Sequence, residues 1–199
     1  MDINLHLTTQ LYVRSYMHVM KVLFITGSGR TESVTTKLCE MTASAMPGAE
    51  TTIIRPHMMR VAHCTGCGEC SSGECVADDD MHRIYSEVER SDIIILATPV
   101  YFSGPSSIMK QVIDRFQCVW SKGVGDRDKA VALIAAGGHS APVFSNTISI
   151  AKAFAATIGA RWAGELTLCG TDYTGSANDL AERTKAFASE VIGAYSEGA

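Results

Sequence analysis

Three nearly uninterrupted apolar runs constrain the fold of this chain more than any other feature. They are Lys21–Thr26 (KVLFIT), Asp92–Ala97 (DIIILA) and Ala130–Ala136 (AVALIAA), and a loop rich in glycine, proline or small polar residues follows each of them. A strand with one solvent-exposed face alternates polar and apolar residues, whereas an unbroken apolar run is typical of a strand buried on both faces of a parallel sheet. The chain has 199 residues, which is enough for one domain with a complete hydrophobic core.

Segments with helical spacing lie between and after these runs, and two weaker strands are expected at Thr51–Arg55 and Trp162–Leu168. Strands that alternate with helices predict a parallel sheet covered on both faces. We therefore expect an α/β, flavodoxin-like fold: a three-layer, doubly wound, five-stranded parallel sheet of order 2-1-3-4-5. The helical faces are Val34/Leu38/Met41/Ala45, Met81/Ile84/Tyr85/Val88 after an N-cap at Asp80, Ile108/Val112/Ile113/Phe116, Phe144–Gly159 and Leu180/Phe187/Val191.

The chain divides into an extension and one domain. Residues 1–19 show no clear period and no motif, so we interpret them as an N-terminal extension. Residues 20–199 contain all the expected strands and helices and form the predicted domain. A cysteine-rich insertion at residues 57–79 follows the second expected strand.

The loop after the first strand has the composition of a phosphate site. It reads Gly27-Ser-Gly-Arg-Thr-Glu-Ser-Val-Thr-Thr36 and leads into a helix, whose N–H groups and dipole favour an anion. It is neither a Walker loop nor a dinucleotide fingerprint, because it lacks GK[ST] and the third glycine. Its hydroxyls and its arginine suit a monoester phosphate bound without magnesium, as in FMN. The alternative is a Ser/Thr-rich helix cap with no ligand.

Two further loops are expected at the same edge of the sheet. Thr98–Pro105 carries two adjacent aromatic residues past a buried strand and could form a wall for a flat ring or merely fill the core. Gly137 and Gly138 allow close approach of the backbone to a ligand. Because carboxyl ends of parallel strands share one edge, these loops should converge there. The cysteine-rich insertion follows the second strand, so we expect it beside them.

Four of the seven cysteines lie within twelve residues, at Cys64, Cys67, Cys70 and Cys75. A compact thiolate run spaced C-x2-C-x2-C-x4-C is a usual ligand set for an iron–sulfur cluster. Glycines between the cysteines let the chain turn back on itself with positive φ. Zinc is an alternative, although zinc sites more often pair two C-x2-C units across a longer gap. Thiols without a metal are the other alternative.

Composition excludes some partners and suggests a compartment. The net charge of −4 gives no sign of a nucleic-acid or anionic-membrane partner, and no apolar run approaches the ~20 residues that span a bilayer. An odd number of cysteines without a secretion signal favours a reducing, cytoplasmic location.

From Met20 onward, the chain resembles the NADPH-dependent FMN reductase family and, within it, the iron–sulfur flavoproteins. The resemblance rests on VLFITGSGR, on CTGCGECSSGEC followed by DDDM, and on ILATPVYFSGP. Gly29 stands where the family usually has proline, and Ser33-Val34 where it often has glycine-asparagine. The resemblance implies FMN phosphate contacts from Ser28, Arg30, Ser33, Val34 and Thr35, contacts to the flavin ring and ribityl chain from Pro99, Val100, Tyr101, Phe102 and Ser103, and an approach to the other side of the ring by Gly137 and Gly138.

Three functions are compatible with these features. The first is an FMN-dependent oxidoreductase that passes electrons from NAD(P)H or a ferredoxin-type donor to a small acceptor such as a quinone, a flavin, oxygen or peroxide. The second is an electron-transfer protein in which a [4Fe–4S] cluster relays single electrons to FMN. The third is a non-catalytic module held by zinc. No side chain is assigned as catalytic, because the chemistry belongs to the cofactor. The family resemblance also implies a homodimer or homotetramer.

Overall fold

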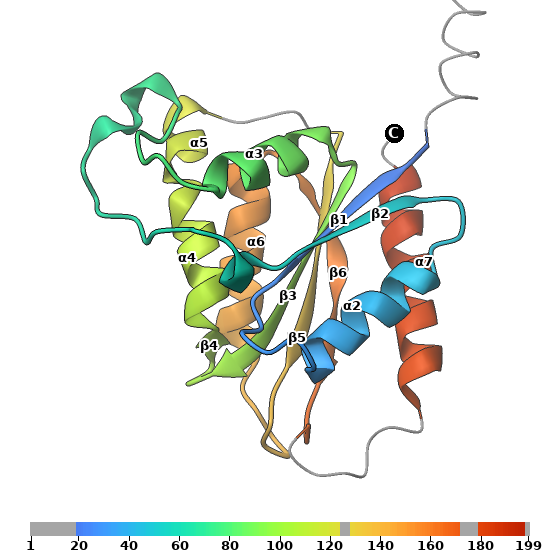
Figure 1. Ribbon diagram of the computed structural model, residues 1–199. Coiled ribbons are helices and arrows are strands. Elements are labelled where there is room, and N and C mark those ends of the chain that lie inside the picture. The colour runs from blue at the N-terminus through green and yellow to red at the C-terminus, as the bar shows by residue number, and fades with distance from the viewer. Residues whose placement is uncertain (1–18, 124–127, 172–178, 198–199) are drawn as a thin grey trace, which may run out of the picture.

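The central element is a parallel sheet in the order β2-β1-β3-β5-β6 (Figure 1). The computed structural model describes residues 19–123, 128–171 and 179–197, so residues 1–18 of the expected extension lie outside the described chain. If the two-residue strand β4 is left out of the numbering, this order is 2-1-3-4-5, and the predicted flavodoxin-like fold is confirmed. The strands are β1 (Lys21–Thr26), β2 (Glu50–Ile54), β3 (Ile93–Tyr101), β4 (Gly104–Pro105), β5 (Ala130–Ala136) and β6 (Arg161–Leu168).

Helices cover both faces of the sheet (Figure 1). Helices α2 and α7 pack on one face, and α3, α4 and α6 pack on the other. The short α5 continues from α4, and two 3-10 turns, η1 and η2, lie in the segment between β2 and α3. The bounds are α2 (Val34–Ser44), η1 (Pro56–Met58), η2 (Glu69–Ser72), α3 (Met81–Arg90), α4 (Ser107–Arg115), α5 (Gln117–Lys122), α6 (Ser145–Thr157) and α7 (Leu180–Ser196).

The unbroken apolar runs are explained by burial on both faces. In β1, Val22 and Phe24 belong to the core under α2 and α7, while Leu23 and Ile25 belong to the core under α3, α4 and α6. Successive side chains of a strand point to opposite faces, so each residue of such a run must be apolar. Among the described residues, no helix is both long and apolar enough to span a bilayer.

The cysteine-rich insertion does not lie where the sequence suggested. After β2 the chain crosses α4, and the amide of Gln111 and the guanidinium of Arg115 bind the carbonyls of Val61 and Ala62. The insertion then packs on α5, at the end of the molecule opposite β4 (Figure 1). The expectation that it would join the other loops was therefore wrong. Contacts about fifty positions apart in the sequence draw it to the opposite edge of the sheet.

A buried hydrogen-bond network joins the loops after β1 and β3. The hydroxyl of Ser106 donates to the carbonyl of Gly27 (2.6 Å) and accepts from the N–H of Met109 (3.2 Å), which caps α4. The N–H of Ser106 donates to Oγ1 of Thr98 (3.0 Å). At Gly27, a Cβ atom would lie 2.7 Å from both Oγ of Ser106 and Cβ of Met109. Only glycine fits here, because contacts that short do not occur at real Cβ atoms.

We expect Ser106→Ala to lower the free energy of unfolding by about 2 kcal/mol, because it removes a buried hydrogen bond and a helix cap. Urea unfolding followed by circular dichroism measures this change. Ser107→Ala is the matched control, because Ser107 is the exposed first residue of the same helix. Equal effects of the two substitutions would contradict the role assigned to Ser106.

Candidate functional site

A cavity of about 650 Å³ opens at the carboxyl edge of the sheet. Cavities of this size commonly hold small-molecule cofactors. It brings together the loops after β1, β3 and β5, as the sequence predicted. Ten of the twelve residues expected at a flavin site line it: Ser28, Arg30, Ser33, Val34, Thr35, Pro99, Val100, Tyr101, Phe102 and Gly138.

The first loop is ordered by its own hydroxyls. Oγ of Ser28 accepts from the N–H of Arg30 (3.2 Å), and Oγ of Ser33 accepts from the N–H of Thr36 (3.0 Å). Ser33 is thus the N-cap of α2, so the helix-cap interpretation holds for this residue. The first N–H groups of a helix have no intrahelical partner, which leaves those of Val34 and Thr35 at the cavity with the positive end of the helix dipole.

The second loop is a tight hairpin with an unusual backbone. Tyr101 pairs with Gly104, and the two residues between them, Phe102 and Ser103, have φ values of 51° and 62°. Non-glycine residues with positive φ store strain and cluster at functional sites. The side chain of Phe102 is fully exposed, so packing against the described residues does not account for this conformation. The hairpin therefore presents an aromatic ring at the rim of the cavity.

At the third loop, Gly138 and the last residue of β5, Ala136, line the cavity, whereas Gly137 does not. Ser103 of the second loop does not line the cavity either. The N–H of Gly137 instead donates to the carbonyl of Leu168 (2.8 Å), which ties β5 to the end of β6. A Cβ at Gly137 would lie 2.6 Å from Pro142, so this glycine serves packing. Five further residues, which were not among the expected flavin contacts, also line the cavity. They are Glu32, Lys37, Ala136, His139 and Thr171.

Helix periodicity offered a signal for one of these missed residues. Lys37 lies one turn beyond Ser33 on α2, so its side chain can share the face that carries the expected phosphate contacts. Thr171 follows β6, a weak strand whose loop carries no motif, and nothing local could have revealed it.

The cysteine loop forms a separate region beside α5. Gly66, Gly68 and Gly73 have φ values of 65°, 83° and 79°, as expected of a chain that turns back on itself. Burial and the charges of neighbouring cysteines, including the three others of the run, raise the pKa of Cys70. Yet no three side chains of the described residues converge as ligands of a metal ion. The four thiols thus lie near one another without forming a preassembled centre.

The two ends of the cysteine loop are joined by acidic side chains. Helix α3 begins at Met81 as predicted, but the carboxylate of Asp80 accepts from the N–H of Arg60 (2.8 Å) instead of capping the helix. Asp79 takes over this task, since its Oδ1 accepts from the N–H of Met81 (3.0 Å). Its Oδ2 accepts from the N–H of Ala62 (2.8 Å). The acidic triplet therefore closes the loop as well as starting the helix.

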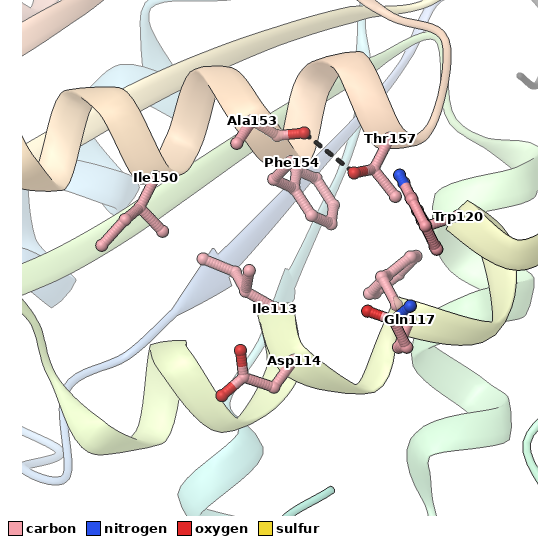
Figure 2. A pocket seen from close by; sticks show the side chains of 9 residues that line it. Ile113, Asp114, Gln117, Trp120, Ile150, Ala153, Phe154 and Thr157 are labelled. Carbon is pink, nitrogen blue, oxygen red and sulfur yellow. Dashed lines mark hydrogen bonds between the residues drawn. The ribbon is translucent and has the colours of Figure 1, made fainter. Parts of the chain in front are cut away.

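A smaller hollow of about 280 Å³ lies between α4, α5 and α6. Figure 2 shows Ile113, Phe154 and Trp120 around it. Its single carboxylate, Asp114, is paired with Lys110 (2.6 Å). The indole of Trp120 is 64% exposed at its edge. This hollow has the character of an apolar surface groove and lacks the chemistry of the first cavity.

A profile of the NADPH-dependent FMN reductase family matches residues 20–167. The chain belongs to this family. It is similar to iron–sulfur flavoproteins from archaea. It is 36% identical to one from Archaeoglobus fulgidus, over 48% of this chain and 45% of that protein, and 39% identical to one from Methanocaldococcus jannaschii, over 48% and 51%. The matched part of the chain thus spans about half the length of these curated relatives.

Solved structures show the same fold at low sequence identity. A flavone reductase superposes with a TM-score of 0.69 at 18% identity, over 89% of this chain and 64% of that one. An FMN-dependent NADH-azoreductase from Bacillus anthracis, solved with FMN, gives 0.61 at 16% identity, over 89% and 98%. An NAD(P)H:quinone oxidoreductase from Methanothermobacter marburgensis gives 0.59 at 15% identity, over 89% and 96%.

The residues at the two sites fit the FMN that the family suggests and the iron–sulfur cluster that the names of the archaeal relatives suggest. At the cavity, hydroxyls, the start of α2 and an exposed aromatic hairpin match the phosphate and the ring of FMN. At the cysteine loop, four free thiols supply the number and type of ligands that a [4Fe–4S] cluster needs. Metal binding is commonly coupled to local folding, so four thiols that are not preassembled are compatible with a site that forms when the metal binds.

The ionisation of Asp79 predicts a loss of stability in acid. Burial by itself would raise its pKa, but hydrogen bonds from Arg115, Ala62 and Met81 outweigh burial and lower the pKa to about 2 from 3.8. A lowered carboxyl pKa stabilises the fold above the unfolded value, and this contribution is lost as the pH falls from about 4 to about 2. We expect this loss to be about 2 kcal/mol.

Urea unfolding at pH 5 and pH 2 tests this expectation. The wild-type protein should lose about 2 kcal/mol more between these two pH values than Asp79→Asn, which cannot ionise at this position. Equal losses in the two proteins would contradict the ionised pair of Asp79 and Arg115.

Proposed function

We propose that this protein is an FMN-dependent oxidoreductase. It would pass electrons from NAD(P)H or a ferredoxin-type donor to a small acceptor such as a quinone, a flavin, oxygen or peroxide. The observation that carries the proposal is the cavity at the carboxyl edge of the sheet, where ten residues expected at a flavin site meet. Membership of the FMN reductase family supports it, as do the FMN-dependent azoreductase and the quinone oxidoreductase among the structural neighbours.

The residues of the cavity have distinct tasks in this proposal. FMN, when bound, supplies the exchange of electrons between donor and acceptor. Ser28, Thr35 and the N–H groups at the start of α2 would hold its phosphate, with Arg30 adding positive charge. Tyr101 and Phe102 would line the ring. The backbone of the strained hairpin would fix the position of Phe102 and so help to orient the flavin ring. No side chain is proposed as a catalytic acid or base.

The phosphate assignment predicts a selective loss of affinity. Thr35→Val keeps the shape of a buried side chain but removes a hydroxyl at the cavity. We expect FMN to bind about tenfold more weakly, because a hydrogen bond to a charged group is worth about 1.5 kcal/mol. Affinity for riboflavin, which lacks the phosphate, should not change. Quenching of flavin fluorescence measures both affinities.

The control for this experiment lies in the same helix. Thr42→Val makes the same chemical change at a buried position where the hydroxyl has no hydrogen-bond partner among the described residues. Its affinity for FMN should equal that of the wild-type protein. If Thr35→Val weakened FMN and riboflavin equally, the hydroxyl would not contact the phosphate.

A second candidate function is electron transfer through a [4Fe–4S] cluster on Cys64, Cys67, Cys70 and Cys75. The closed loop with four free thiols and the similarity to iron–sulfur flavoproteins favour it. Anaerobic purification followed by iron, sulfide and flavin analysis separates the two functions. About four irons per chain would support the cluster. Flavin alone with rapid NAD(P)H oxidation would support the first function, and one zinc with no flavin would contradict both.

The expected assembly is also a proposal. We propose a homodimer or homotetramer, because exposed Trp120 and Phe102 leave apolar surface at two places on the chain. We also propose a cytoplasmic location, because seven cysteines, an odd number, fit a reducing compartment. Light scattering of the purified protein should give a mass of two or four chains of 21.3 kDa. The mass of a single chain would contradict this assembly.

A further inference from the structure

A set of hydrogen bonds closes the neck of the cysteine loop, which we define as residues 60–62 and 79–80. The N–H of Asp80 donates to the carbonyl of Arg60 (2.9 Å), and the carboxylate of Asp80 accepts from the N–H of Arg60 (2.8 Å). The N–H of Ala62 donates to Oδ2 of Asp79 (2.8 Å). The loop that carries the four cysteines therefore leaves and returns through one hydrogen-bonded point.

Arg115, the last residue of α4, holds this neck from inside the protein. Its Nη1 donates to Oδ2 of Asp79 (2.6 Å) and to the carbonyl of Ala62 (2.9 Å), and its Nη2 donates to Oδ1 of Asp79 (3.1 Å). The side chains of Arg115 and Asp79 are only 1% and 4% exposed. Two parallel bonds between guanidinium and carboxylate fix the geometry of such a pair. Both backbone groups of Ala62 are thus held by the pair.

One N–H of Arg115 is left over in a buried position. Nε is buried, and none of the described residues accepts a hydrogen bond from it. A buried donor without a partner is costly, so each instance in a folded protein asks for an explanation. Cys75 of the loop lines one pocket together with Tyr85, Phe116 and Cys118, which lie around the end of α4. The spare donor and a nearby sulfur therefore occur at the same place.

Tyr85 and Cys118 add further support to this end of α4. The hydroxyl of Tyr85 donates to the carbonyl of Arg115 (2.6 Å), and the thiol of Cys118 lies 3.4 Å from the same oxygen. These contacts fix the backbone of Arg115 as well as its side chain. Because both the backbone and the guanidinium of Arg115 are held by hydrogen bonds, the positive charge and the unpaired Nε–H stay beside the cysteine loop.

We propose that Arg115 is a positioning residue for a metal centre on the cysteine loop. It holds the neck closed through Asp79 and directs its remaining N–H toward the sulfur ligands. This inference rests on the proposed cluster of the second candidate function. Partners of this kind orient metal ligands, and hydrogen bonds to cluster sulfur tune the reduction potential. A positive group at this place favours the more negative, reduced state of such a centre.

The test compares the wild-type protein with three variants after anaerobic reconstitution with iron and sulfide. Arg115→Gln removes the charge and the fork, and Arg115→Lys keeps the charge but loses the fork. Asp114→Asn is the matched control, because it breaks the exposed pair with Lys110 on the same helix. Circular dichroism and thermal melting establish that each variant is folded. Three readouts follow: iron loss to a chelator, the midpoint potential, and amide hydrogen exchange at the neck.

We expect both Arg115 variants to lose iron about 10-fold to 100-fold faster than the wild-type protein, as is usual when a residue that supports metal ligands is removed. Asp114→Asn should behave as the wild type. The midpoint potential should become more negative in Arg115→Gln and stay closer to the wild-type value in Arg115→Lys. In both variants, the amides of Arg60, Ala62 and Asp80 should exchange faster, with or without iron.

Two outcomes would overturn the inference, and they differ. If the wild type takes up no iron, the proposed cluster fails and the role of Arg115 fails with it. If the wild type holds iron and both Arg115 variants hold it equally well at the same potential, the cluster stands. Arg115 would then serve the fold alone, whatever happens to amide exchange at the neck.

Discussion

The hydrogen bond from the Ser106 hydroxyl to the Gly27 carbonyl (2.6 Å) joins two of the loops that form the candidate flavin site. Parallel pairing of β1 with β3 brings both loops to one edge, but it leaves their spacing open. The Ser106 bond sets that spacing, and the absence of a Cβ at Gly27 lets α4 approach close enough to form it. The start of α2 and the strained Phe102 hairpin then face a common cavity.

Helix α4 links this cavity to the cysteine loop. Ser106 caps its first turn beside Gly27, and Arg115 ends it inside the neck of the loop. Nine residues of helix separate the two positions by about 14 Å. Each end of α4 therefore carries a polar group that holds a loop from a different part of the chain. The two candidate sites are fixed relative to each other by one short, rigid element.

Local patterns in the sequence predicted most of the fold and most of the residues that line the cavity at the carboxyl edge of the sheet. Apolar runs reveal strands buried on both faces, and the hydroxyl-rich loop before α2 was placed correctly. The location of the cysteine loop could not be predicted in this way, because Gln111 and Arg115 bind the preceding segment about fifty residues away. The role of Asp79 in closing the loop could not be predicted either, because its partner Arg115 is distant in sequence.

The two proposed functions together place flavin and metal at opposite edges of one sheet, with α4 between them. A crystal structure of the anaerobically purified protein with FMN, recorded at the iron absorption edge, is the decisive measurement. We expect the flavin phosphate at the start of α2 and the iron signal inside the cysteine loop beside α5. A flavin phosphate bound away from α2, or iron within the cavity that Phe102 borders, would contradict this arrangement.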